Sequence, residues 1–207
     1  MLKIWGRKTS SNVQKVLWCC EELRLPFERI DAGREFGGLD EESYLARNPN
    51  GLIPTLEDGE TVIWESNAIL RYLARKYDGG DRLYPTDPAK ASAVDQWLDW
   101  QLTVLGPPMG TLFIQLIRTS ATERDPRLIA EALTRSTAAW TLLDGQLQKR
   151  DYVAGDQLTL ADLALGSPIY RWRKLDIERP QLPALAAWYA RIERHPGFQR
   201  YVAGPIV

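Results

Sequence analysis

In the first part of the chain, some apolar runs are typical of strands and others recur at helical spacing. In the rest of the chain, only the helical spacing is found. Leu2 to Trp5 is a short apolar run typical of a strand. After the polar run 8–12, apolar residues recur at helical spacing, at Val13, Val16, Leu17, Cys20 and Leu23. Residues 26–31 alternate poorly, but a strand there would supply the partner that a strand-helix-strand unit needs. The chain is therefore expected to begin with such a unit.

In residues 48–73, NPNGLIPTLEDGETVIWESNAILRYL, a proline loop, a hairpin and a helix start follow one another directly. Thr55 to Glu57 and Thr61 to Trp64 predict two strands, with Asp58-Gly59 as the signal for a type I′ turn. Glu65-Ser66 then opens a helix. The glycines and glutamates of residues 32–47 predict a loop and a short helix. Together these segments predict a mixed four-stranded sheet with three helices.

A cluster of Gly, Asp and Pro, DGGDRLYPTDP at residues 78–88, separates this mixed pattern from an almost wholly helical one. We expect an α/β domain at 1–79, a linker at 80–87 and an all-α domain at 88–207. Helices are predicted from Ala89, with a kink or an interruption at Gly106-Pro107-Pro108, from Asp125-Pro126, and over Leu163 to Ile169 after a capping box that begins at Thr159. The last helix is predicted to run from Leu185 to Ile192 and to end near His195-Pro196-Gly197.

Charge and composition narrow the class of protein. The 207 residues carry 26 basic and 27 acidic side chains, a formal net charge of -1, so neither nucleic acid nor an anionic membrane is an expected partner. The N-terminus has no signal-peptide core, and no apolar run reaches membrane-spanning length, so we expect a soluble, cytoplasmic protein. Cys19 and Cys20 are adjacent and poorly placed for a disulfide or a metal site, and His195 is the only histidine. No metal site or histidine-based triad is expected.

Three short motifs could bind a peptide-like ligand. Ile53-Pro54 ends a loop, and a cis bond there would turn the backbone groups of Ile53 outward toward a ligand. Ser66 follows Glu65 at a helix start, where free N-H groups and the positive end of the helix dipole bind carboxylates. Ser10, Ser11 and Asn12 stand before the first predicted helix, where the same field favours an anionic group.

In this order and spacing, the motifs resemble those of the soluble glutathione transferases, and the resemblance extends over the whole chain. It implies a thioredoxin-like N-terminal domain, a helical C-terminal bundle and a homodimer. It also implies that Ile53 and Pro54 pair with the cysteinyl backbone of glutathione, and that Glu65 and Ser66 hold its γ-glutamyl end. Thr159 and Asp162 match the family's capping box, which implies a role in folding.

The resemblance is to serine-type members, such as the phi and theta classes, because the loop has no tyrosine or cysteine. Ser10 is the preferred thiolate donor by the phi pattern, and Thr9, Ser11 and Asn12 are competitors. A thiol with a pKa of about 8.5 needs roughly 2.7 kcal/mol of preferential stabilisation for its pKa to fall by about two units. One hydroxyl and one or two N-H groups can supply this.

The chain departs from the family pattern at the position that would bind the glycine end of glutathione. Many relatives carry Lys or Gln before the hydrophobic residue of the proline loop, whereas this chain has Leu52. Asn50, Arg34 and Lys8 are the alternative groups for the glycine carboxylate.

The sequence gives a less specific signal for the side chains that would surround a second substrate. Trp97, Trp100, Met109 and Phe113 could line an apolar pocket, although an aromatic stripe at helical spacing more often packs in a core or a dimer interface. The basic group of Arg171, Arg173 and Lys174 is interpreted as a solvated face.

The resulting hypothesis is a glutathione S-transferase that joins glutathione, as co-substrate, to a small hydrophobic electrophile, or that reduces a peroxide. Two alternatives stay open. One is a non-catalytic binding or interaction protein with the same fold, and the other is a glutathione-dependent dehalogenase or isomerase.

Overall fold

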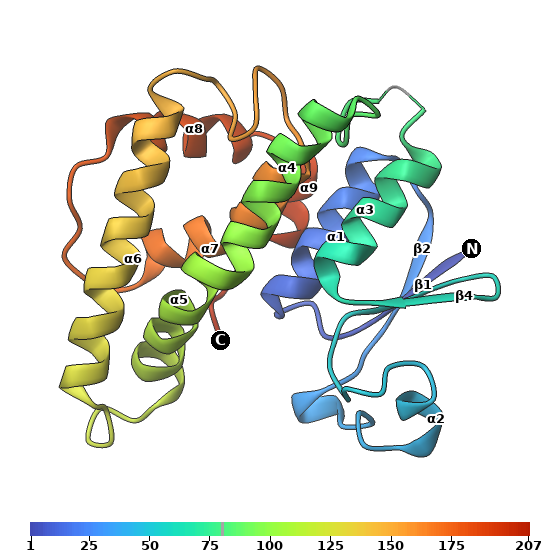
Figure 1. The fold of residues 1–207 in the computed structure, drawn as a ribbon. Coiled ribbons are helices and arrows are strands. Elements are labelled where there is room, and N and C mark those ends of the chain that lie inside the picture. The colour runs from blue at the N-terminus through green and yellow to red at the C-terminus, as the bar shows by residue number, and fades with distance from the viewer. Residues whose placement is uncertain (80) are drawn as a thin grey trace.

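The computed structural model describes residues 1–79 and 81–207, which form an α/β domain beside a helical domain (Figure 1). In the first domain, the sheet order is β2-β1-β3-β4, with β1 parallel to β2 and the other pairs antiparallel. The elements are β1 (Leu2–Trp5), α1 (Ser11–Glu22), β2 (Phe27–Ile30), the 3-10 turn η1 (Arg34–Phe36), α2 (Glu42–Leu45), β3 (Thr55–Asp58), β4 (Thr61–Trp64) and α3 (Ser66–Tyr77). The predicted four-stranded mixed sheet is confirmed.

The second domain contains only helical elements among its described residues. They are α4 (Pro88–Trp100), η2 (Gln101–Leu105), α5 (Gly106–Phe113), η3 (Ile114–Arg118), α6 (Pro126–Leu147), α7 (Leu160–Lys174), α8 (Pro183–Ile192) and α9 (Pro196–Tyr201). The predicted fold class, a thioredoxin-like α/β domain followed by a helical domain, is confirmed. The domain limits 1–79, 80–87 and 88–207 stay predictions, and Gly80, the first residue of the predicted linker, lies outside the described residues.

The β3–β4 turn differs from the prediction. Asp58 is still part of β3 and pairs with Thr61, so Gly59 and Glu60 form the turn. A type I′ turn needs a positive φ at both central residues, whereas here Gly59 has a φ of 62° and Glu60 is not left-handed. The physical reason lies in α3, where three side chains bind the Asp58 carboxylate and so keep Asp58 in the strand: Tyr72, Lys76 and Tyr77, each at 2.7 Å.

A kink or an interruption is predicted at Gly106-Pro107-Pro108, and the structure shows no interruption of the helical path there. Helical backbone continues from Pro88 to Arg118 and widens into π turns at η2 and η3. Pro107 lies in the first turn of α5, where its missing N-H is least costly, and the wider turn of η2 precedes it.

The C-terminal end contains a helix that the sequence pattern did not predict. Helix α8 ends at Ile192, as predicted, and His195 is the N-cap of a further helix, α9, with Pro196 in its first turn. The short helix is stabilised by packing, because the buried Phe198 contacts Trp18 edge-on at 5.3 Å between ring centroids.

Helix α1 connects the two domains. All eight residues from Val13 to Cys20 are buried, because α1 packs against the sheet and α3 on one side and against α7 and α9 on the other (Figure 1). Trp18 fits between two glycines of the second domain. A Cβ added to Gly166 would lie 2.5 Å from the Trp18 ring, and one added to Gly197 would lie 2.3 Å from it. Glycine is therefore required at both contacts.

The capping box of α7 is formed and buried. Asp162 is fully buried and accepts hydrogen bonds from the Thr159 N-H at 2.8 Å, the Thr159 hydroxyl at 3.1 Å, the Val153 N-H at 3.0 Å and Trp188 Nε1 at 2.8 Å. The carboxylate thus ties the start of α7 to the preceding loop and to α8. Among the helices of residues 1–79 and 81–207, none is long and apolar enough to cross a membrane.

Candidate functional site

Ser10 occupies the N-cap position of α1 but does not cap the helix with its side chain. Its backbone is extended, at φ −78° and ψ 124°, and its carbonyl accepts the Gln14 N-H at 2.8 Å. Within the described chain, the Ser10 hydroxyl makes no capping hydrogen bond, and the first turn of α1 holds no acidic side chain. The first N-H groups of α1 and this hydroxyl can therefore bind an anion, which the positive end of the helix dipole also favours.

The proline loop lies against the start of the same β1–α1 loop. The Ile53-Pro54 bond is cis, as predicted. Gly6 has a φ of 143°, and a Cβ built there would lie 2.5 Å from Val13 and 3.1 Å from the Cβ of Ile53. Only glycine allows this approach, which brings the loop that leads to Ser10 beside Ile53.

The Glu65-Ser66 turn has an uncommon backbone. Glu65 is an exposed non-glycine residue with a φ of 67°, and Ser66 is the first residue of α3. Such a conformation costs on the order of 1–3 kcal/mol and persists only where the surroundings fix it. Asn67, the next residue, is held on both sides: its Oδ1 accepts from Lys15 Nζ at 2.6 Å, and its Nδ2 donates to the Leu98 carbonyl at 2.9 Å. The contact of Asn67 with Leu98 of the second domain thus helps to hold the Glu65-Ser66 turn in place.

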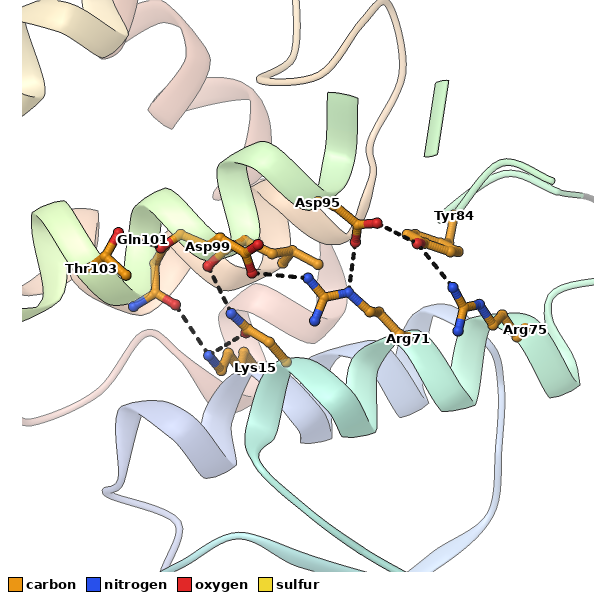
Figure 2. A network of polar contacts seen from close by, with 10 residues as sticks. Lys15, Arg71, Arg75, Tyr84, Asp95, Asp99, Gln101 and Thr103 are labelled. Carbon is orange, nitrogen blue, oxygen red and sulfur yellow. Dashed lines mark hydrogen bonds and ion pairs between the residues drawn. The ribbon is translucent and has the colours of Figure 1, made fainter. Parts of the chain in front are cut away.

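Lys15 is a buried cation that the sequence interpretation missed. Only 2% of its surface is exposed, and its Nζ also donates to Gln101 Oε1 at 3.3 Å (Figure 2). Burial lowers the pKa of Lys15 to about 7, while the negative charge of Glu65 opposes that shift. In the sequence, the signal for this burial was the polar pair Gln14-Lys15 between the apolar residues Val13 and Val16.

Helices α3 and α4 are joined by a row of polar contacts that continues from Lys15 (Figure 2). Arg71 binds Asp95 at 2.6 Å and Asp99 at 3.2 Å. Tyr84 donates to the same Asp95 at 2.8 Å and accepts from Arg75 at 3.2 Å. These bonds fix the orientation of α3, and therefore of Ser66 at its start, relative to the second domain.

The structure separates the three candidates for the glycine carboxylate. Asn50 is tied to Asn48, whose Oδ1 accepts from Asn50 Nδ2 at 3.1 Å. Lys8 and Thr9 line a different cavity of about 600 Å³, between β2 and α9. Burial, and after it the charge of the exposed Arg34 in η1, lowers the pKa of Arg7 in the β1–α1 loop. We therefore rank Arg34 first.

The side of the site that faces the second domain holds a small cavity of about 80 Å³. Ser11 lines it from α1, with Gln101, Gly106, Met109, Gly110, Pro168 and Arg171 from the second domain. Of the four predicted pocket residues, Met109 lines this cavity, whereas Trp97 and Trp100 pack against each other with ring centroids 5.1 Å apart. Phe113 is buried beneath a guanidinium group, as described next.

Arg171 contradicts the interpretation of its segment as a solvated face. Its Nη2 donates to the Thr9 carbonyl at 3.2 Å, and its guanidinium carbon lies 3.9 Å from the centroid of the Phe113 ring. Burial lowers the pKa of Arg171 to about 10, and the nearby Arg118 and Arg7 act in the same direction. Arg173 and Lys174 are exposed, as predicted.

Comparison with known proteins assigns the chain to a family. Residues 9–76 match the family described as "Glutathione S-transferase, N-terminal domain", and residues 95–196 match "Glutathione S-transferase, C-terminal domain". The chain is 38% identical to glutathione S-transferase GstB of Escherichia coli strain K12, over 100% of both chains. It is 29% identical to glutathione S-transferase D6 of Drosophila melanogaster, over 98% of this chain and 92% of the relative.

Solved structures agree with this assignment. A theta class glutathione S-transferase from Xanthomonas axonopodis pv. citri, with glutathione bound, is 45% identical and superimposes with a TM-score of 0.95 over 100% of this chain and 99% of that chain. Glutathione transferase F7 from Populus trichocarpa is 26% identical, with a TM-score of 0.87 over 97% of both chains. The helix-start serine, the cis-proline loop and the Glu-Ser turn thus occur in a chain that belongs to the glutathione S-transferase family.

Proposed function

We propose that this chain binds glutathione across the β1–α1 loop, the cis-proline loop and the start of α3. In this proposal, it joins the thiolate sulfur of glutathione to a small electrophile. The observation that carries the proposal is the Ser10 hydroxyl, which stands at the start of α1 and leaves the helix uncapped. The glutathione bound to the Xanthomonas relative supports the choice of co-substrate.

In this proposal, Ser10 stabilises the thiolate together with the first N-H groups of α1. Lowering the thiol pKa by about two units needs roughly 2.7 kcal/mol, which a charge-assisted hydrogen bond and a helix dipole can supply together. Ser11 and Asn12, in the first turn of the helix, are the competing donors. Thr9 is a weaker competitor, because it lines the cavity on the β2 side.

The rest of the tripeptide is assigned by residue. The backbone of Ile53, before Pro54, would pair with the cysteinyl unit, and Glu65 and Ser66 would hold the γ-glutamyl amine and carboxylate. Arg34, with Asn50 as the alternative, would hold the glycine carboxylate. Binding at these remote ends orients the sulfur, and such orientation contributes to rate enhancement.

Thiolate formation tests this assignment. Glutathione is titrated into the wild-type protein, Ser10→Ala and Ser11→Ala at neutral pH, and thiolate absorbance and binding heat are recorded together. We expect thiolate in the wild type and in Ser11→Ala, and binding without thiolate in Ser10→Ala. Thiolate in Ser10→Ala but not in Ser11→Ala would transfer the role to Ser11.

The same titration separates the alternatives. Binding without thiolate in all three proteins would favour a non-catalytic binding or interaction protein. Thiolate formation with turnover of a peroxide, a halogenated compound or an isomerisable compound would favour peroxidase, dehalogenase or isomerase activity. A homodimer and a cytoplasmic location are further parts of the proposal and rest on the family resemblance; sedimentation of the purified protein tests the first.

A further inference from the structure

Three arginines from distant parts of the sequence meet at the junction of the domains. Arg7 lies in the β1–α1 loop, Arg118 ends η3 and Arg171 lies in α7. The guanidinium carbons of Arg118 and Arg171 lie 4.6 Å and 3.9 Å from the centroid of the same Phe113 ring. Arg171 also contacts Thr9 and lines the small cavity beside Ser11. Arg171 therefore borders the space beside the proposed thiolate, and Arg118 lies against the same aromatic ring.

Arg7 connects this pair to the glutathione side of the site. A Cβ built on Gly33 would lie 3.3 Å from Arg7 Nη1 and 3.6 Å from the Ile53 side chain, so this guanidinium lies beside the cis-proline loop. Its Nε is buried and has no hydrogen-bond partner among the described residues. A buried donor without an acceptor is costly, and a bound anion would remove that cost.

The positive charge of this arginine group is poorly balanced. Within residues 1–79 and 81–207, no Asp or Glu side chain forms an ion pair with Arg7, Arg118 or Arg171. Glu35 acts on Arg7 only at longer range, and the Val207 carbonyl lies 3.4 Å from Arg118 Nη2. Each guanidinium has five N-H donors, so these contacts leave capacity for a ligand.

We propose that the electrophile carries a carboxylate next to the carbon that the thiolate attacks, and that Arg118, Arg171 and Arg7 bind this carboxylate. The inference rests on the proposed transferase function and specifies its small electrophile as an anion, in place of the hydrophobic electrophile expected from the sequence. The cavity of about 80 Å³ beside Ser11 is far below the roughly 300–1,000 Å³ typical of sites for drug-sized ligands, so it fits a short acid.

An α-halo acid shows the chemistry that this arrangement supports. The glutathione thiol loses its proton to solvent when it binds, and the thiolate sulfur attacks the carbon that bears the halogen. A carbon–sulfur bond forms as the carbon–halogen bond breaks, and the halide leaves with the bonding electrons. The two reactants are both anions, so the arginines offset a repulsion that slows the reaction in water.

Iodoacetate and iodoacetamide form a matched pair of probes, because they share the leaving group and nearly the same size but differ in charge. For each probe, kcat/KM at saturating glutathione is divided by the uncatalysed rate constant with glutathione. We expect the wild-type acceleration to be at least about tenfold larger for iodoacetate, the value of one charge-assisted hydrogen bond. The protein's own Cys19 and Cys20 are fully buried, and burial raises the pKa of both thiols, which protects them from the probes.

The variant Arg118→Gln tests the site, because Arg118 is exposed and the fold does not depend on its burial. We expect the preference for iodoacetate to fall about tenfold in this variant. Arg127→Gln removes the same charge from an exposed arginine at the start of α6 and should keep the wild-type preference.

The outcomes separate this inference from the proposed function. Acceleration of iodoacetamide that equals or exceeds that of iodoacetate would overturn the anionic electrophile and leave the transferase intact. A preference that is unchanged in Arg118→Gln, or reduced equally in Arg127→Gln, would overturn the arginine site. If thiolate never forms in the titration with glutathione alone, the proposed function itself fails.

Discussion

Replacing Lys15 by Met should remove a pH-dependent component of stability. Lys15 has a pKa of about 7 in the folded protein, because burial beside the neutral amides of Asn67 and Gln101 disfavours its charged form. In the unfolded chain its pKa returns to about 10.4. Between these values the unfolded state binds more protons than the folded state. The contribution of Lys15 to stability therefore increases as the pH rises from about 7 to about 10, and it is lost as the pH falls back.

The size of the effect follows from the two pKa values. A proton-binding difference of one changes the free energy of unfolding by about 1.4 kcal/mol per pH unit. Integration from about pH 7.5 to about pH 9.5 gives a gain of about 2.5 kcal/mol for the wild type that the Met variant lacks. The two amide oxygens that lose their donor in Lys15→Met destabilise the variant equally at all these pH values, so they do not affect the slope.

Urea unfolding at several pH values measures this difference. Both proteins are unfolded at about pH 7.5, 8.5 and 9.5, and the difference in unfolding free energy between them is plotted against pH, which cancels the other titrating groups. Equal slopes for the two proteins would refute a depressed pKa for Lys15. A wild type that loses stability relative to the variant as the pH rises would show that the folded protein instead holds Lys15 charged.

Three other substitutions test features of the fold and the site. Asp162→Ala leaves four buried donors without their acceptor and should lower the free energy of unfolding by on the order of 4 kcal/mol, as urea unfolding can measure; a loss below about 1 kcal/mol would contradict the buried capping box. Gly166→Ala should cost about 1–3 kcal/mol because its Cβ would meet Trp18, whereas Gly145→Ala, with open space around it in α6, should be neutral or stabilising by up to about 1 kcal/mol. Ser66→Ala should raise the KM for glutathione about tenfold with a smaller change in kcat, and an unchanged KM would remove Ser66 from the proposed γ-glutamyl site.

Local patterns predicted the features that neighbouring residues determine. The strands, the capping box of α7 and the cis-proline loop follow from short motifs, and the fold class follows from the change of period near residue 88. The β3–β4 turn shows the limit of such motifs: Asp-Gly favours one turn type, but the contacts of Asp58 with α3 determine the observed one. Similarly, α9 is too short to show a helical period and is held by its packing on Trp18.

The missed residues are those whose environment comes from distant parts of the chain. The partners of Lys15 are 52 and 86 positions away, and those of Arg171 lie on the β1–α1 loop and α5. A lysine or an arginine in a helix is most often solvated, so its burial cannot be read from its neighbours in sequence. The three arginines at the domain junction form a group only after the helices pack.

The complete burial of Val13 to Cys20 in α1 has a consequence for how the protein can be divided. A helix at a protein surface keeps one polar side in water, but α1 has no such side over these two turns. A fragment that contained only the first 79 residues would expose Trp18 and the apolar residues beside it, and would leave Gln14 and Lys15 without the partners that Ser167 and Gln101 provide. The two domains should therefore unfold in a single cooperative transition, and protease cleavage between them should release a fragment that aggregates rather than a stable half.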